Sequence, residues 1–347
     1  MSTQPVSPRG QAMATVSVFV GLDYHAGSVQ ACVLDGTGRI LANQRLANSA
    51  TRLDEFVRGF GTRIQAAIEA CPGAAHLADE LATRHGWDIR QAHPGFVSRM
   101  RQSPDKTDWA DARVLADLTR VGYLPVVWLA PEPIRELRRL TRFRQQLVDQ
   151  RRSTKLRVRA VLRECRVKLF ATGWTKKWMC ELASAELPAQ ARWVIDQHLR
   201  HLAFCNHEVE VVEKRIAETV ADDPIVAKLK SQVGIGLVTA AVIRAEVGVF
   251  NRFRNGKQLA RYCGLTPRNA SSGERQADAG LVKAGNTHLR TVLIEAAHRL
   301  ARFDPRWKEY RAGLKSRGKS GSVAAAAVAN RWVRGLVHQM QEASMAA

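Results

Sequence analysis

The stretch VSVFVGLDYHAGSVQACVLDGTGRILANQR, residues 16–45, predicts how the N-terminal part of this 347-residue chain folds. Two apolar runs within it, residues 16–23 and 28–35, are rich in the β-branched and aromatic side chains that favour buried strands. A turn of the type Asp-Gly-Thr-Gly leads from the second run into a third strand at residues 39–45. The chain therefore begins with three strands in succession.

The segments that follow continue as alternating helices and strands. A helix is expected over residues 51–60, a strand over 64–70, a helix over 74–86 that stops at Gly86, and a strand over 87–93. This β-β-β-α-β-α-β order matches an α/β core of the ribonuclease H (RuvC-like) type, closed by a helix that begins near residue 108. Prolines at 125, 131 and 133 mark the end of this predicted domain, residues 17–125. The polar residues 1–16 are expected to form a disordered tail.

Four carboxylates lie at positions where this fold brings strand and helix ends to one edge. Asp23 ends the first strand, Glu69 ends the fourth, and Asp108 and Asp111 share one face of the closing helix. Each of them alone could be an ordinary cap or surface residue. Together they would repel one another unless a cation neutralised them, and hard oxygen ligands suit Mg²⁺. Two such ions about 4 Å apart are the usual device for phosphodiester displacement.

The charge of the chain is divided unevenly along its length. Residues 1–130 hold 13 Lys and Arg against 12 Asp and Glu, whereas the remainder holds 40 against 20. A nearly neutral catalytic part joined to a basic part predicts a nucleic-acid partner, gripped through its phosphates. The six cysteines are scattered without a Cys-x-x-Cys pair, which argues for a reducing cytoplasm and against a zinc site. No signal peptide or membrane-spanning run is evident, so no membrane partner is expected.

The middle region, residues 126–225, is expected to be helical and basic. Its first segment places Arg138 and Arg142 beside an apolar face, and both are candidate phosphate contacts. Its second segment resembles a coiled-coil seam, which would pair two copies of the chain. The alternative is a helical hairpin formed by the two segments of one chain. The seam consists of apolar side chains in steps of three and four: Ile195, Leu199, Leu202, Cys205, Val209, Val212 and Ile216.

The third region, residues 226–347, begins with a candidate phosphate-binding turn. In SQVGIGLVTAAVIRAEVG, residues 231–248, Gly234 and Gly236 separate two apolar helices, as in a helix-hairpin-helix. A polar loop further on contains Ser271 and Ser272. Spacing alone does not make either serine a nucleophile, because serines in loops mostly form turns. The remaining candidate nucleic-acid contacts are Lys106, Lys283 and Arg290.

Taken in order, these motifs resemble the DEDD-class transposases of insertion sequences whose elements encode a bridge RNA. The N-terminal matches are GLD around Asp23, IEA around Glu69, and KTDWADARVLA around the paired aspartates. The C-terminal matches are GIGLVTAA, RFRNGKQLARYCGLTPR, SSG and KAGNTHLR. The resemblance covers roughly residues 17–300, and the combination of motifs is more specific than any single one.

The resemblance implies a site-specific recombinase that excises and inserts its own mobile element. It implies that Asp23, Glu69, Asp108 and Asp111 hold Mg²⁺ and that a serine of the C-terminal transposase domain attacks DNA. That serine aligns with Ser272, with Ser271 as the fallback. It further implies a guide RNA as partner, and a dimer or tetramer in which the carboxylates of one protomer meet the serine of another.

Two other classes of function remain open on the residues alone. A metal-dependent nuclease of the junction-resolvase kind would use the same carboxylates with water as the nucleophile. A non-catalytic nucleic-acid-binding protein would use the basic helices and the glycine turn, with the carboxylates as incidental caps. A covalent protein–DNA adduct separates the recombinase from both, and metal-dependent cleavage separates the nuclease from the binding protein.

Overall fold

The computed structural model describes residues 17–100, 107–269, 278–282 and 285–345, which fall into two compact units. The first unit ends at Ala130 and the second begins at Pro131. The predicted disordered tail, residues 1–16, lies outside the described residues.

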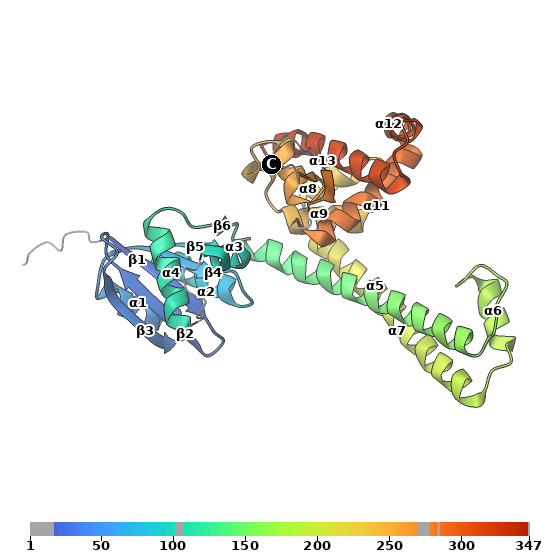
Figure 1. Ribbon diagram of the computed structural model, residues 1–347, viewed down its shortest axis with the longest axis horizontal. Helices are drawn as coiled ribbons and strands as arrows, with labels where there is room; N and C mark the ends of the chain where they lie inside the picture. Colours follow the sequence, from blue (N-terminus) through green and yellow to red (C-terminus); the bar gives the residue numbers. More distant parts are fainter. Residues whose placement is uncertain (1–16, 101–106, 270–277, 283–284, 346–347) are drawn as a thin grey trace, which may run out of the picture. The chain divides into compact units, whose positions relative to one another are not determined.

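The first unit is a mixed sheet with helices on both faces (Figure 1). Its strands are ordered β3-β2-β1-β4-β5-β6, with β1 antiparallel to β2 and parallel to β4. This arrangement is compatible with the predicted ribonuclease H-like domain. The strands are β1 (Ser17–Tyr24), β2 (Ser28–Leu34), β3 (Ile40–Ala47), β4 (Arg63–Glu69), β5 (Asp88–Ala92) and β6 (Val126–Val127).

Alternation along the central strands decides which helices cover which face. Val18, Val20 and Leu22 of β1 point into a core shared with two helices, α1 (Ala50–Arg58) and α2 (Ala74–His85). The opposite face packs on two others, α3 (Pro94–Met100) and α4 (Asp108–Arg120). Because side chains alternate along a strand, Gly21 and Asp23 belong to the face that α4 covers.

A glycine in the central strand sets how closely α4 approaches the sheet. A Cβ atom on Gly21 would lie 1.9 Å from the carbonyl oxygen of Ala112 and 2.5 Å from the amide nitrogen of Ala116. Both atoms are backbone atoms of α4, so they cannot turn aside. The helix begins where the Thr107 side chain accepts a hydrogen bond from the amide of Ala110. Strand and cap together fix the first turn of α4 beside the end of β1.

We expect Gly21→Ala to push α4 away from the sheet. Overpacking of this kind costs about 1–3 kcal/mol of unfolding free energy, and it should also weaken any activity that needs α4 in place. Gly27→Ala is the matched control, because a Cβ there meets nothing within 4 Å. Urea unfolding of the two variants checks the prediction, which fails if both lose the same stability.

The first unit extends past the predicted boundary at residue 125. Ala92 of β5 pairs with Val126 and Gln91 with Val127, so the short strand β6 closes the edge of the sheet. A two-residue strand is too short to produce a hydrophobic period, and the prolines around it favoured an exit from the domain. The boundary accordingly lies at Ala130 in the structure.

In the second unit two long helices form a hairpin. The helices α5 (Glu132–Glu164) and α7 (Ala189–Thr219) pack along each other and are joined through α6 (Lys176–Ser184) (Figure 1). All but one of the seam residues of α7 are buried within the single chain, and Leu199 is partly buried. The seam therefore packs on α5 of the same molecule, as in the predicted alternative of a helical hairpin within one chain. The spacing of these residues thus gives no support for a coiled coil between two chains.

The remaining helices form a bundle on one core with the near ends of α5 and α7. Leu137, Val209 and Ile216 share this core with side chains from all the long helices that follow. The predicted boundary at residue 225 therefore does not separate two compact units. The bundle contains α8 (Pro224–Lys230), α9 (Leu237–Val247), the 3₁₀ turn η1 (Phe250–Arg252), α10 (Gly256–Tyr262), β7 (Pro267–Asn269), β8 (Asp278–Leu281), α11 (Thr287–Phe303), α12 (Pro305–Ser316) and α13 (Gly321–Met345).

Two general expectations can be compared with the structure. All six cysteines are free thiols. Among the helices in the described part of the chain, none combines the length and apolarity needed to span a bilayer.

Candidate functional site

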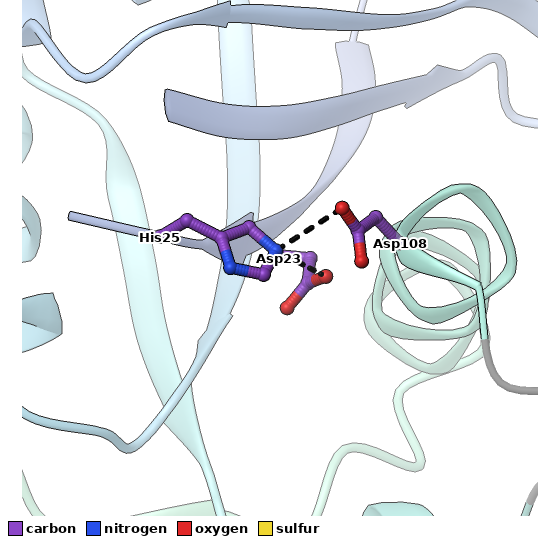
Figure 2. Close-up of side chains that lie close together, drawn as sticks. All are labelled: Asp23, His25 and Asp108. Carbon is purple, nitrogen blue, oxygen red and sulfur yellow. Dashed lines mark ion pairs between the residues drawn. The ribbon is translucent and has the colours of Figure 1, made fainter. Parts of the chain in front are cut away.

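At the end of β1, two of the four predicted carboxylates converge on one histidine. His25 Nε2 lies 3.4 Å from Asp23 Oδ2 and 3.2 Å from Asp108 Oδ2 (Figure 2). Asp23 comes from β1, Asp108 from the first turn of α4, and His25 from the turn that follows β1. Asp23 is the most enclosed of the three, with 19% of its side chain exposed, whereas His25 and Asp108 are open to solvent. Groups from two separate elements thus form one cluster.

The other two predicted carboxylates, Glu69 and Asp111, lie near this cluster but are not among the three residues whose ligand atoms lie closest together. Leu22 of β1 pairs with Ile68 of β4, and the two strands are parallel. Asp23 and Glu69, each one residue further along, therefore lie side by side at the ends of these strands. Asp111 lies one turn after Asp108 on α4 and is 5% exposed. The fold therefore places all four carboxylates around the same end of the sheet, as the sequence predicts.

The pKa of Asp23 is perturbed by burial and by the carboxylates around it. Burial raises the pKa of Asp23 above its usual value, the neighbouring His25 opposes the rise, and Asp108, Asp111 and Glu69 add to it. A bound cation would relieve this repulsion by neutralising the carboxylates. A carboxyl group with a perturbed pKa beside others is also a common mark of a functional site.

The donor set fits a divalent metal ion. Asp23, His25 and Asp108 each offer one ligand atom, and these atoms all lie within 4.8 Å of one another. Carboxylate oxygens are the ligands that Mg²⁺ prefers, and the net negative charge of the surrounding four acids favours a hard cation. An imidazole nitrogen is tolerated by Mn²⁺ and other first-row metals as well.

His25 is the residue that the sequence reasoning missed. It follows Asp23 by two positions, and residues two apart at the end of a strand lie on the same face. The Asp-x-His spacing at the end of a predicted strand could therefore have indicated His25 as a member of the site. The backbone supports the placement, because the His25 amide donates to the carbonyl of Ser28 and holds the turn.

The predicted serine nucleophile with its fallback, together with the predicted nucleic-acid contacts, falls into three groups. Ser271, Ser272, Lys106 and Lys283 lie outside the described residues. Gly234 and Gly236 form the turn between α8 and α9, with the Gly234 carbonyl accepting from Arg299 Nε and Gly236 exposed at the start of α9. The others, Arg138, Arg142 and Arg290, make internal hydrogen bonds.

Arg138 and Arg142 both reach from α5 to the end of α9. Arg142 binds the Glu246 carboxylate through Nε and Nη2 at 2.8 and 2.9 Å, and Arg138 Nε donates to the carbonyl of Ala245 at 2.6 Å. Glu246 is only 1% exposed. Both guanidinium groups thus bind internal acceptors and have a structural role, while the phosphate contact stays a prediction for them.

The same carboxylate holds the base of the β7–β8 hairpin. Asn286 Nδ2 donates to Glu246 at 2.7 Å, and the Asn286 amide donates to the carbonyl of Tyr262 at 3.1 Å. Tyr262 in turn donates from its hydroxyl to the Glu246 carbonyl. Tyr262 precedes the hairpin and Asn286 follows it, so Glu246 ties its two ends together.

A close backbone approach and one further arginine complete the base of the hairpin. A Cβ on Gly285 would lie 2.4 Å from the Cα of Gly264, so neither position has room for a side chain on that side. Arg290 donates to the carbonyl of Val282 and to the hydroxyl of Thr287. In sequence the hairpin encloses residues 270–277, which include Ser271 and Ser272. The described residues thus form a tied base at the two strands between which, in the sequence, the predicted nucleophile falls.

The sheet order and the acidic cluster define a class, the α/β domains compatible with the ribonuclease H-like catalytic domains of DEDD transposases. Comparison with known families points to the same class. A sequence model of DEDD transposases of the IS110 group matches residues 20–167, and one described as "Transposase IS116/IS110/IS902 family" matches residues 226–312. The chain belongs to this family of transposases.

Individual relatives agree with this assignment. A family 20 transposase of Pseudomonas aeruginosa is 28% identical over 330 residues, covering 91% of this chain and 94% of the relative. The transposase for insertion sequence element IS1328 of Yersinia enterocolitica is 25% identical over 321 residues, with the same coverage. The Sinorhizobium fredii protein y4qE, which carries a transposase name, is 33% identical over 217 residues; this match covers 61% of the chain and about half, 52%, of that relative.

Proposed function

We propose that the protein cleaves and rejoins DNA strands to move an insertion element, with a divalent metal centre in its first unit and a serine nucleophile in its second. The observation that carries the proposal is the convergence of Asp23 and Asp108 on His25 at the end of the central strand. The names of the relatives support transposition as the biological outcome. The proposed ions are Mg²⁺, two in number, bound by Asp23, Glu69, Asp108 and Asp111.

The chemistry divides between the residues and the metal. When bound, Mg²⁺ would neutralise the phosphate and stabilise the charge that develops on the departing oxygen. Asp23 and Glu69 hold their position through the parallel pairing of β1 and β4, and Asp108 and Asp111 through the capped start of α4. A site fixed on strands and a helix start keeps its ligands in place with little reorganisation.

In the proposed step, the Ser272 oxygen forms a bond to phosphorus while the bond from phosphorus to one DNA oxygen breaks. The serine proton leaves to a base, and the departing DNA oxygen becomes a hydroxyl. The resulting phosphoserine link conserves the energy of the broken bond, so a second DNA hydroxyl can reverse the attack and join the strands without a co-reactant.

The basic second unit indicates nucleic acids as partners. The charge of +20 beyond residue 130 suits binding of DNA and of a guide RNA by their phosphates. Target choice by base pairing with that RNA would leave the protein mainly shape and backbone to recognise. A dimer or tetramer would bring a serine of one protomer to the carboxylates of another. Sequencing the RNA that copurifies with the protein tests the guide directly.

A covalent adduct is the expected result that tests the serine. With Mg²⁺ and a labelled DNA carrying the element end, wild-type protein should form a denaturant-resistant protein–DNA adduct, visible by gel electrophoresis. Ser272→Ala should abolish it, while the unfolding midpoint and DNA affinity barely change, because a loop hydroxyl contributes little to a core. Ser271→Ala is the matched neighbour and should keep the adduct.

The other outcomes are equally informative. Loss of the adduct in Ser271→Ala alone moves the nucleophile by one residue. Metal-dependent cleavage without any adduct in wild type would mean that water attacks, as in a nuclease of the junction-resolvase kind. Binding without cleavage under all metal conditions would leave only a nucleic-acid-binding protein.

A further inference from the structure

The second unit contains a broad groove of about 1270 Å³ that no function considered so far uses. Its walls come from α10, the β7–β8 hairpin, α12 and α13, together with the turn before α13. Small or apolar side chains line its interior, among them Val323, Ala326 and Ala327. Basic side chains stand around it: Lys257, Arg306, Lys319, Arg331, Arg334 and His338.

The charge of the groove has one sign. Its described lining contains five Lys and Arg side chains and a histidine but no carboxylate. All five of these cations are exposed, and none forms an ion pair with an acid in the described part of the chain. Like charges gathered in a concave surface raise its positive potential and attract polyanions. These side chains therefore differ from Arg142, which forms an ion pair with a buried carboxylate.

The fold brings these cations together from separate elements. On α13, Val323, Ala327, Arg331, Arg334 and His338 recur in steps of three and four, so they lie on one face of the helix. Most of the residues between them are buried in the core: Ala324, Ala325, Val328, Ala329, Trp332, Val333, Leu336 and Val337.

A backbone approach brings α10 onto the same face. A Cβ on Gly256 would lie 2.1 Å from the carbonyl oxygen of Arg334, so α10 packs directly on α13. Lys257, the next residue, is thereby set beside Arg334 at the rim of the groove.

One wall of the groove is the base of the hairpin that encloses the serines in sequence. Pro267 of β7 and the pair Gly280 and Leu281 of β8 line it. A polyanion seated among the cations therefore lies against the same hairpin whose two ends Glu246 ties together.

We propose that this groove binds the sugar–phosphate backbone of the DNA strand that the hairpin serine attacks. The proposal rests on the proposed function, because only a serine nucleophile requires the scissile strand at this hairpin. The cations would contact successive phosphates, and the small apolar interior leaves room for sugars and bases without reading their sequence. Guide RNA is the other polyanion available to a protein of this kind, and the experiment separates the two.

The test compares two triple variants of the full-length chain. The groove variant carries Arg306→Gln, Arg331→Gln and Arg334→Gln; the control carries Arg152→Gln, Arg157→Gln and Arg215→Gln, three exposed arginines of the α5–α7 hairpin. Binding of a fluorescent DNA duplex and of an RNA of equal length is measured against salt in a chelator, so that cleavage plays no part. Circular dichroism confirms that both variants are folded.

We expect the groove variant to lose about three units of slope in log affinity against log salt for DNA, and at least about tenfold in affinity at 0.1 M salt. The control should keep the wild-type slope. An unchanged DNA slope in the groove variant overturns the proposal, as does a loss confined to RNA. Neither result affects the adduct test on Ser272, so failure here is distinguishable from failure of the proposed function.

Contact is tested separately by photo-crosslinking in the presence of the same DNA. A photoreactive residue replaces Val323 in the groove or Val211 on α7, which are 51% and 50% exposed. Labelled DNA should crosslink at position 323 and not at 211. Equal crosslinking at both positions would mean that the groove holds no preferred strand.

Discussion

Asp23→Asn is expected to abolish DNA strand cleavage, by more than about a hundredfold, while leaving DNA affinity nearly unchanged. The substitution keeps the shape of the side chain but removes the charge at the centre of the cluster formed with His25 and Asp108. DNA binding should survive because the basic surplus lies in the other unit. Cleavage of a labelled element end and a parallel binding titration measure the two effects.

The same variant should be more stable than wild type when no metal is present. Burial and three nearby carboxylates raise the pKa of Asp23 in the folded protein. Its ionised form therefore opposes folding, and this penalty is absent below the unfolded-state pKa and grows as pH rises through the folded-state pKa. A gain in thermal midpoint at neutral pH in a chelator, combined with lost cleavage, indicates a site built for a ligand. Asp117→Asn, an exposed acid on α4, is the control and should change neither quantity.

Glu246→Gln is expected to destabilise the second unit by about 3 kcal/mol. The Glu246 carboxylate is 1% exposed and accepts from Arg142 and Asn286, with His288 Nδ1 at 3.6 Å. Removing its charge leaves arginine side chains directed at a neutral amide. The figure is at the low end for a buried pair because Arg142 is partly exposed and can turn toward water. Because Glu246 also ties the ends of the β7–β8 hairpin, adduct formation should fall too.

A second ion pair made by α5, between Arg144 and Glu213 of α7, provides the control for this effect. Glu213→Gln removes the partner of Arg144, but that pair is partly open to solvent and should cost no more than about 1 kcal/mol. Chemical denaturation of both variants gives the comparison. Equal losses of unfolding free energy in the two variants would show that the burial of Glu246 does not strengthen its ion pair.

Glu246 also predicts a direction of pH dependence. Burial alone would raise its pKa, but His288, Arg142 and Asn286 outweigh burial and hold the pKa well below its ordinary value. Its stabilising contribution is therefore complete above the unfolded-state pKa of about 4.3 and is lost as pH falls below it. Wild type should lose stability below about pH 4 more steeply than Glu246→Gln.

The sequence was most informative where alternation and burial coincide. The strands predicted at residues 16–45 and 64–70 appear in the structure as β1 to β4. The patterns of β1, β2 and β4 are strong because helices cover both faces of the sheet there, whereas β3, which has no buried residue, was predicted with the help of the turn before it. The same alternation places Asp23 and Glu69 on the face that α4 covers. The family resemblance drawn from the motifs is confirmed by the family matches.

The features that could not be predicted depend on contacts between distant segments. The ion pair of Arg142 could not be predicted because its partner, Glu246, is 104 residues away in an otherwise mostly apolar helix. The seam of α7 carries the same period whether it packs on its own chain or on another, so spacing alone could not choose. The basic groove draws residues from α10, the β7–β8 hairpin, α12, α13 and the turn before α13, and its five Lys and Arg residues are scattered between positions 257 and 334 of the sequence.

The metal centre is the central claim, and direct binding of Mn²⁺ tests it most closely. Electron paramagnetic resonance of full-length protein titrated with Mn²⁺ should show saturable binding in wild type and in Asp117→Asn. The double variant Asp23→Asn with Asp108→Asn should lose that binding while remaining folded. If the double variant bound Mn²⁺ as tightly as wild type, the cluster at the end of β1 would not be the metal centre.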